Sequence, residues 1–418
     1  MSLFFPIIKH LRSFYNPVPM ADEQPLNSLQ ILKYNPQIDG LRFCAVLFVV
    51  SYHWIPSISH APVSSFFGGF INFFFVLSSY LITRILFSAK EKSVKMGISK
   101  FKAMLIFFLR RTLRIFPAYY FFLLLVLLLP TIGNEVRDNA GMYFSYLANF
   151  HIFQSQDFPA VTSHIWTLAV EEQFYLVWPL LILFIPHRHL LKTFLTIIIG
   201  SVILRAMCYY PAPGVPQAVL TQYCVDAFAV GGLLAYKYTT SDKERRAITK
   251  YFNMVLYAGI PFGIIIIFTR SAYLSFVFNR LLFAMISLKI VEGTIAGYKS
   301  YFGKFLENKV VLYLGRISYG IYLYHLVVPV AFWKLYDFTY GYMRTHHASF
   351  LARHQQGINR IENIIISEAV CFFIYAVLVV AVAAISAVLI EKPINKLKVS
   401  FNFDIRKPAL KPLNEPAA

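Results

Sequence analysis

Charged residues are scarce in this chain of 418 residues, and their scarcity argues against a soluble fold. Only 14% of the residues are Asp, Glu, Lys or Arg, whereas soluble domains average about 25%. Hydrophobic residues make up 58% of the chain, and the mean hydropathy is +0.58. The sequence therefore predicts an all-α integral membrane protein with little room for a separate soluble domain.

Cysteine is also scarce, which argues against a disulfide scaffold or a cysteine-rich metal site. The four cysteines, Cys44, Cys208, Cys224 and Cys371, form no CxxC spacing. We predict no metal site. Residues 1–37 lack the layout of a signal peptide, so we expect the first spanning helix to act as its own insertion signal.

Acidic residues are half as frequent as basic ones, with 20 against 39, and the formal net charge is +19. Such an excess suits nucleic-acid binding, but the basic residues cluster in short loops between apolar runs. That distribution is the positive-inside pattern of membrane proteins. We therefore predict a lipid bilayer as the environment and no nucleic-acid partner.

Long apolar runs indicate about ten transmembrane helices, since a span needs roughly 20 apolar residues. The sixth run is the weakest, because Asp226 interrupts it and Gly231 and Gly232 follow. The runs cover approximately 40–58, 66–86, 116–133, 166–186, 190–209, 218–236, 252–269, 279–297, 312–333 and 364–390.

The loop charges predict the orientation. Residues 84–114 hold nine basic residues and one acidic residue, whereas residues 134–164 hold a single basic residue, Arg137. The first loop is therefore expected inside and the second outside. The later loops continue this alternation, and only the loop around 334–363 weakens it, because it also carries several basic residues. We predict a cytoplasmic segment 1–37, a membrane domain 38–396 and a cytoplasmic tail 397–418.

The first run, "IDGLRFCAVLFVVSYHW", carries Arg42 and His53 on one helix face. They are eleven residues apart, which is about 16 Å along a helix axis. Arg42 falls at the cytoplasmic end and His53 toward the outside. Ordinary alternatives stay open: Asp39 caps the helix, Arg42 reaches the lipid headgroups, and His53 is a hydrogen-bonded interior residue.

The fourth run, "HIWTLAVEEQFYLVWPLL", places Glu171 and Glu172 at membrane depth. A charged carboxylate there costs at least ~2.5–3.5 kcal/mol near the centre of a helix, so it marks a functional site. The run enters from the outside, which puts both glutamates in the depth range of His53. We predict that one glutamate orients His53 as a general base and that the other pairs with a cation or binds substrate hydroxyls.

Three arginines lie at the cytoplasmic mouth of the third run: Arg110, Arg111 and Arg114. For any single one of them, the positive-inside rule is the favoured explanation. Together with Arg42 they also form a clamp for phosphate groups, because guanidinium groups match phosphate oxygens. Coenzyme A held there could present its acyl thioester near His53, since a pantetheine arm has about the reach of the Arg42–His53 separation.

Six segments, in family order, resemble the acyltransferase-3 family of membrane O-acyltransferases over roughly residues 36–396. They are the Arg42–His53 run, "FFFVLSSYLITRIL", "RRTLRIFPAYY", "HIWTLAVEEQFY", "LGRISYGIYLYHLVV" (314–328) and "EKPINK" (391–396). Against the common family pattern, Asn72 replaces an Asp, Ser79 a Gly and Cys224 an Arg, and "YLYHLVV" lacks a Trp and a Pro.

The resemblance implies a function and assigns roles. The family moves acyl groups, usually acetyl from cytoplasmic acyl-CoA, onto hydroxyls of extracytoplasmic sugars, as in O-acetylation of cell-surface polysaccharides. By match, His53, Glu171 and Glu172 are the catalytic candidates, and Arg42 with Arg110, Arg111 and Arg114 bind acyl-CoA. We assign Asp39, His164, Trp166 and His325 to the substrate.

Further expectations follow from the resemblance. Residues 392–418 are too few for the esterase-like domain fused to some members, so we expect a standalone member in a bacterial inner membrane. The acceptor, the acyl chain, the oligomeric state, any partner protein and the choice between base and acyl carrier for His53 stay open. The rival hypotheses are a transporter or flippase for a lipid-linked glycan and a membrane scaffold or receptor.

Overall fold

Helices and short connections account for all the residues that the computed structural model describes, and no strand occurs among them. The described residues are 34–59, 69–130, 132–210, 217–347, 349, 353–354 and 367–397. The predicted tail 397–418, apart from its first residue, and most of the predicted segment 1–37 lie outside them. The all-α class is confirmed.

Seven helical segments in the described part are long and apolar enough to cross a membrane. The prediction of a multi-pass membrane protein is therefore confirmed, while the orientation of the termini stays a prediction. The segments are α5 (Ile71–Lys95), α6 (Lys100–Leu128), η1 (Ser163–Ile165) with α10 (Trp166–Phe184), α11 (His187–Met207), α13 (Asp242–Thr269), α14 (Ala272–Ala296), and α20 (Glu368–Ser386) continued by η4 (Ala387–Glu391) and α21 (Lys392–Lys396).

The other three predicted runs are less apolar, shorter or broken, so the expected count of about ten spans is not confirmed. The first is α2 (Pro36–Trp54), and the sixth is α12 (Val225–Lys237), which has only 13 residues. The ninth divides into α16 (Lys309–Arg316), α17 (Ser318–Tyr324) and α18 (Val327–His346). The short connecting helices are α3 (Pro56–Ser59), α7 (Asn134–Asp138), α8 (Ala140–Phe144), α9 (Ala148–Ser155), η2 (Gln217–Val219), η3 (Thr221–Tyr223) and α15 (Tyr301–Leu306).

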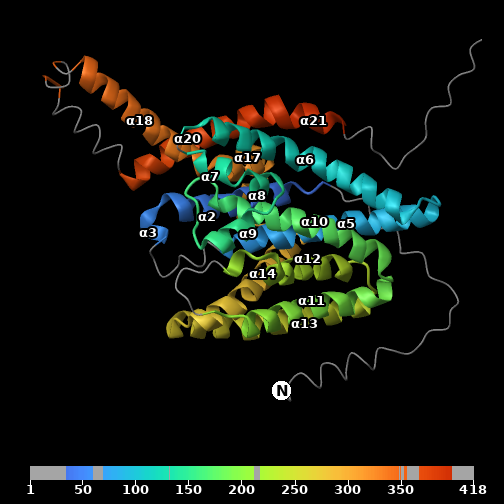
Figure 1. Ribbon diagram of the computed structural model, residues 1–418. Coiled ribbons are helices and arrows are strands. Elements are labelled where there is room, and N and C mark those ends of the chain that lie inside the picture. Colours follow the sequence, from blue (N-terminus) through green and yellow to red (C-terminus); the bar gives the residue numbers. More distant parts are fainter. Residues whose placement is uncertain are drawn as a thin grey trace, which may run out of the picture. The chain divides into compact units, whose positions relative to one another are not determined.

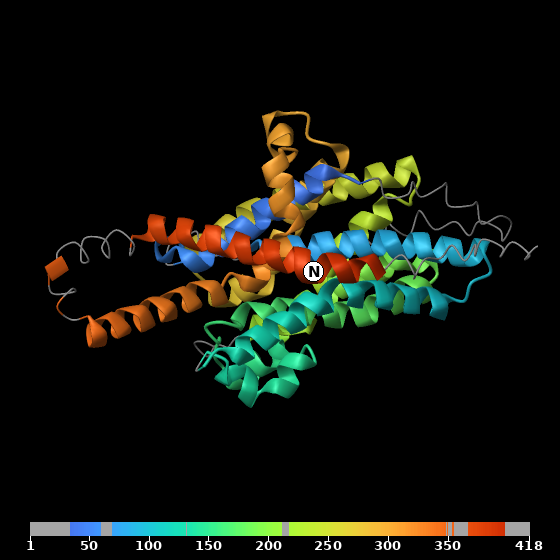
Figure 2. The ribbon, with the colours of Figure 1, turned by 90° about the horizontal axis from the view of Figure 1, so that it is seen from above.

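Helix α5 is central to the packing of the described residues. It contacts α2, α6, α10, α12 and α14 (Figure 1). Helix α18 is the opposite case, because it extends beyond the start of α20 in both views and only Val327 of its residues is buried (Figure 1, Figure 2). The candidate site lies between α5 and its neighbours α2, α6 and α10.

Local sequence explains where α2 begins. Asn35 caps the helix, because its side chain accepts a hydrogen bond from the Gln37 N–H at 3.0 Å, and Pro36 occupies the first helical position. Asp39 is therefore not the cap. It lies in the first turn and is available for an ion pair.

Close approach between helices depends on particular glycines. A Cβ at Gly231 of α12 would lie 2.2 Å from the Val76 carbonyl oxygen of α5 and 2.9 Å from the Ser79 Cβ. The family glycine that Ser79 replaces is thus dispensable here because the facing residue is a glycine. The Ser79 hydroxyl then donates a hydrogen bond to the Phe228 carbonyl at 2.5 Å.

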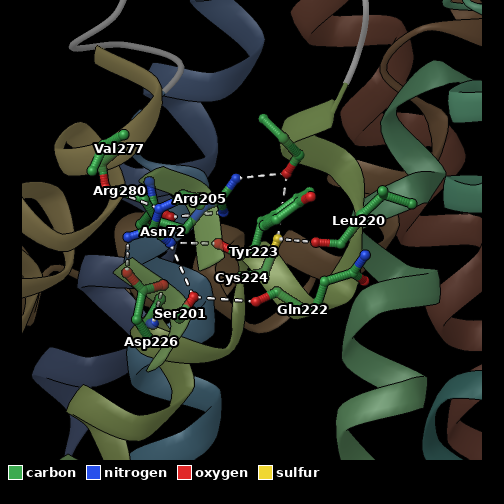
Figure 3. A network of polar contacts seen from close by, with 12 residues as sticks. Asn72, Ser201, Arg205, Leu220, Gln222, Tyr223, Cys224, Asp226, Val277 and Arg280 are labelled. Atoms are coloured by element: carbon green, nitrogen blue, oxygen red, sulfur yellow. Dashed lines mark hydrogen bonds and ion pairs between the residues drawn. The ribbon is translucent and has the colours of Figure 1, made fainter. Parts of the chain in front are cut away.

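A buried polar network joins α11, α12 and α14 (Figure 3). Arg205 is only 1% exposed and pairs with the fully buried Asp226 at 2.6 Å. Its other donors bond the carbonyls of Val277 and Tyr223 and the Ser201 hydroxyl. Asp226 therefore has an arginine partner from the neighbouring helix α11, although Cys224 stands where the family pattern has an arginine.

Asn72, which stands where the family pattern has an Asp, also has an arginine partner (Figure 3). The Asn72 side-chain oxygen accepts a hydrogen bond from Arg280 at 3.1 Å, and Arg280 also donates to the Ala218 carbonyl at 2.8 Å. The network ties the short helix α12 and the chain before it to α5 and α14.

Candidate active site

A cavity of about 380 Å³ is lined by residues of α2, α5, α6, α10, α16, α17, η4 and α21. It gathers residues from all six motifs quoted above, although these are far apart in the chain. Its lining includes Arg42, Ser78, Arg111, Arg114, Thr167, Glu171, Glu172, Tyr175, Arg316, Ser318, Tyr319, Tyr322, Glu391 and Asn395, together with the apolar Ile71, Phe74, Phe75, Leu77, Leu81, Ile115 and Leu168.

The lining changes in character along the cavity. On α10, Tyr175 lies at one end and Thr167 at the other, eight residues or about 12 Å apart. Four arginines, from α2, α6 and α16, line the end near Tyr175. The opposite end is mainly apolar, with Phe74, Phe75 and Leu168 beside Thr167 and Tyr322. The cavity is thus suited to a long ligand that is anionic at one end and apolar at the other.

The arginines are held at the cationic end by specific partners. Asp39 lies 4.0 Å from Arg42 and 3.7 Å from Arg316, so one carboxylate positions two guanidinium groups. Arg111 lies over the Tyr175 ring at 4.7 Å from its centroid, which is a cation–π contact. Arg110 is exposed and is not part of the lining. Of the predicted cluster, Arg111 and Arg114 reach the cavity with Arg42.

The two glutamates have different surroundings, and no hydrogen bond or ion pair of the described residues joins either of them to His53. Glu171 accepts hydrogen bonds from Ser78 at 3.0 Å and from Tyr175 at 3.0 Å. Glu172 has a buried carboxylate oxygen with no hydrogen-bond partner in the described part of the chain. The expected pairing of a glutamate with His53 is corrected by this arrangement.

The depth argument failed because His164, not Glu171, is the residue of this segment that lies at the level of His53. The ring of His53 faces His325, with centroids 5.1 Å apart, and His325 faces His164 at 4.7 Å. His325 and His164 are 0% and 3% exposed, whereas His53 is exposed. The three imidazoles form a row from α2, the end of α17 and η1, the short helix before α10.

The break between α17 and α18 explains how His325 is held. Pro329 has no N–H, so the His325 carbonyl cannot receive the usual helical hydrogen bond from that position. The indole N–H of Trp54 donates to this carbonyl instead, at 2.8 Å. Because Trp54 follows His53 directly, the contact also positions His53.

The same helix end sets the tautomers of the two buried histidines. His325 Nδ1 bonds the Tyr322 carbonyl at 2.5 Å, and His164 Nε2 bonds the Leu323 carbonyl at 3.0 Å. A carbonyl only accepts, so both nitrogens carry hydrogen. When the rings are neutral, His325 Nε2 and His164 Nδ1 are acceptors, and both are buried without a hydrogen-bond partner among the described residues. Hydroxyl groups are suitable donors to them.

Tyr322 and Thr167 connect the cavity to the histidines, and sequence reasoning did not identify them. Their hydroxyl oxygens lie 2.6 Å apart, and the Tyr322 hydroxyl also bonds the His164 carbonyl at 2.9 Å. The Tyr322 ring lies 5.4 Å from both His164 and His325. The apolar end of the cavity is therefore adjacent to the histidine row.

Other site residues were predicted differently or missed. Trp166, assigned to the substrate, starts α10 and packs against Phe75, with ring centroids 6.3 Å apart. Asp39, also assigned to the substrate, lies at the cationic end instead of near His53.

Four further residues that line the cavity received no role from the sequence: Arg316, Ser318, Glu391 and Asn395. These residues belong to the late motifs "LGRISYG" and "EKPINK", which could have indicated them.

Within the described residues, no group of three or more His, Cys, Asp or Glu side chains is placed to hold a metal ion.

Comparison with known families identifies the class of this multi-pass membrane protein. The family described as "Acyltransferase domain" matches residues 35–388, which is most of the chain. The chain therefore belongs to this acyltransferase family, and the resemblance to the acyltransferase-3 family is confirmed.

The relatives with assigned names are bacterial. The chain is 35% identical over 317 residues to the peptidoglycan O-acetyltransferase OatA of Listeria monocytogenes, covering 70% of this chain and 49% of that protein. It is 26% identical over 335 residues to the O-acetyltransferase OatA of Staphylococcus aureus, covering 74% and 53%. The chain thus spans about half the length of these relatives. No solved structure matches it.

Proposed function

We propose that this protein is a membrane O-acyltransferase that moves an acetyl group from cytoplasmic acetyl-CoA to a hydroxyl group of an extracytoplasmic glycan. Membership of the acyltransferase family supports the reaction class, and the name of the Listeria relative supports acetyl transfer to peptidoglycan, a cell-wall glycan. A location in a bacterial inner membrane is part of the same proposal. One structural observation carries the proposal: the cationic cavity ends against the row of three histidines.

The donor is assigned to the cavity. The phosphate groups of the acyl-CoA bind Arg42, Arg111, Arg114 and Arg316, with the exposed Arg110 contributing outside the lining. The pantetheine arm follows the cavity toward Thr167 and Tyr322. The thioester then lies beside Tyr322, whose ring contacts two histidines.

The acceptor is assigned to the histidine row. The acceptor atoms of His164 and His325 bind hydroxyl groups of the glycan. Trp166, two residues after His164, is assigned to the same substrate. His53 removes the proton of the reacting hydroxyl. The hydroxyl oxygen then attacks the thioester carbonyl carbon, the carbon–sulfur bond breaks, and the leaving thiolate takes the proton.

A second route uses the same residues. In it, the His53 nitrogen attacks the thioester carbonyl, coenzyme A leaves, and the glycan hydroxyl then displaces His53 from the acyl-imidazole. The two routes are separated by acid quenching in the absence of glycan: only the second accumulates acyl groups on the protein. Glu171 and Glu172 act in either route through the cavity and not through contact with His53.

The first experiment measures release of coenzyme A from acetyl-CoA by the protein in lipid nanodiscs, with and without a peptidoglycan fragment as acceptor. The wild type is expected to release coenzyme A and to form the acetylated glycan, whereas His53→Ala does neither while remaining monodisperse. Equal turnover by both proteins would contradict the role of His53. Absence of acetyl-CoA binding to the wild type would refute the acyltransferase proposal and leave the transporter hypothesis.

A further inference from the structure

Three polar side chains that line the cavity carry buried atoms without partners among the described residues. They are the Glu172 Oε1, Ser318 Oγ and Asn395 Oδ1 atoms, and none has a hydrogen-bond partner among the described residues. We propose that Glu172, Ser318 and Asn395 form the binding site for the pantetheine segment of the acyl donor. This inference rests on the proposed function and names the contacts that the arginines do not provide.

The energetics point to a ligand. A buried polar atom without a hydrogen bond costs about 1–3 kcal/mol, and folded proteins contain few of them. Three such atoms line this one cavity, and they come from three separate elements, α10, α17 and α21. The neighbouring Glu171 provides the contrast, because Ser78 and Tyr175 satisfy both of its oxygens. Glu171 is thus held by the protein, whereas Glu172 faces the cavity unsatisfied.

The positions of Glu172 and Ser318 match the middle of the donor. Ser318 lies two residues after Arg316 of the cationic end and four residues before Tyr322 of the apolar end. Glu172 lies between Tyr175 and Thr167 on α10 in the same way. In acyl-CoA the pantetheine segment likewise lies between the phosphates and the thioester.

The chemistry of the three atoms also fits this segment. The Glu172 carboxylate and the Asn395 carbonyl oxygen only accept hydrogen bonds, and the Ser318 hydroxyl accepts or donates. Their ligand must therefore present N–H or O–H donors. Phosphates and acyl chains lack such donors, whereas pantetheine carries amide N–H groups and a hydroxyl. A sugar also carries donors, but these residues lie on the arginine side of the Thr167–Tyr322 contact.

The test uses a series of acetyl donors with the full-length protein in nanodiscs. S-acetylpantetheine lacks the nucleotide of acetyl-CoA, and S-acetyl-N-acetylcysteamine also lacks most of the pantetheine. Ser318→Ala and Asn395→Ala are expected to reduce the kcat/KM preference for acetylpantetheine over acetyl-N-acetylcysteamine by about threefold to tenfold each. Both variants are expected to elute as monodisperse protein on size-exclusion chromatography, which shows that they are folded.

Two further variants make the result specific. Arg111→Gln is expected to reduce only the preference for acetyl-CoA over acetylpantetheine. Ser287→Ala, which removes a buried serine of α14 outside the cavity, is expected to leave both preferences unchanged. If Ser318→Ala and Asn395→Ala both turned over the donors and kept the wild-type preference for acetylpantetheine, this inference would be overturned and the proposed function would stand. No turnover of any thioester by the wild type would overturn the proposed function and the inference with it.

Discussion

The imidazole rings of His53 and His325 face each other with centroids 5.1 Å apart. The Trp54 indole, next to His53, donates a hydrogen bond to the His325 carbonyl at 2.8 Å. The first predicted helix and a helix break near the other end of the chain thereby meet at one point. His53 thus lies beside a second imidazole, and no hydrogen bond or ion pair within the described part of the chain joins it to a carboxylate.

Substitution of His325 is expected to stop glycan acetylation. The variant His325→Asn retains a side-chain N–H for the helix end but lacks the ring acceptor, so transfer should fall at least ~100-fold. Binding of acetyl-CoA should be unchanged, because His325 is not in the cavity lining. Product formation and acetyl-CoA binding are measured in parallel.

The matched control for this prediction is His346→Ala, which removes an exposed histidine at the end of α18. It should retain wild-type transfer. If His325→Asn were folded and transferred acetyl groups at the wild-type rate, the histidine row would have no part in the acceptor step.

Loss of one cavity arginine is expected to weaken donor binding. Hydrogen bonds to charged groups contribute about 1.5–3 kcal/mol, so Arg111→Gln should raise the Kd for acetyl-CoA roughly 10- to 100-fold. Lys102→Gln, an exposed basic residue of the same helix outside the lining, serves as the control. Calorimetry at fixed ionic strength measures both. An equal loss in the two variants would indicate a diffuse charge effect instead of a phosphate site.

The buried pair of Arg205 and Asp226 predicts an unusual stability pattern. Removing one partner, as in Arg205→Met, leaves an uncompensated buried charge and should cost about 3–5 kcal/mol. The double variant Arg205→Met/Asp226→Leu should recover most of this loss, because no charge is then buried. Unfolding in detergent followed by tryptophan fluorescence reports both values. A double variant as unstable as the single one would mean that the hydrogen bonds of Arg205 to Val277 and Tyr223 dominate.

Two glycines allow a direct test of helix packing. A Cβ at Gly231 would lie 2.2 Å from the Val76 carbonyl, whereas a Cβ at Gly200 would meet no atom within 4 Å. Gly231→Ala should therefore destabilise the fold by about 1–3 kcal/mol. Gly200→Ala should stabilise it by up to ~1 kcal/mol, because alanine is the better helix former. Thermal unfolding of the two variants in the same detergent should give shifts of opposite sign.

The sequence by itself determined the class of the protein and the local parts of its site. Run length and loop charge indicated membrane helices, since the cost of burying polar groups in lipid acts on each segment separately. Helix periodicity placed Arg42 and His53 on one face of α2, and the motif "RRTLRI" marked two of the arginines that line the cavity. These inferences depend only on neighbouring residues.

The tertiary structure decided which of these parts meet. In the folded protein, Glu171 accepts hydrogen bonds from Ser78 and Tyr175. The rings of His325 and His164 continue the row that begins at His53. Asp226 pairs with Arg205, whereas the family pattern has an arginine at position 224. Depth along a helix could not predict these partners. The rotation of each helix is set by its packing against all its neighbours, and a shift of one residue turns a side chain by about 100°.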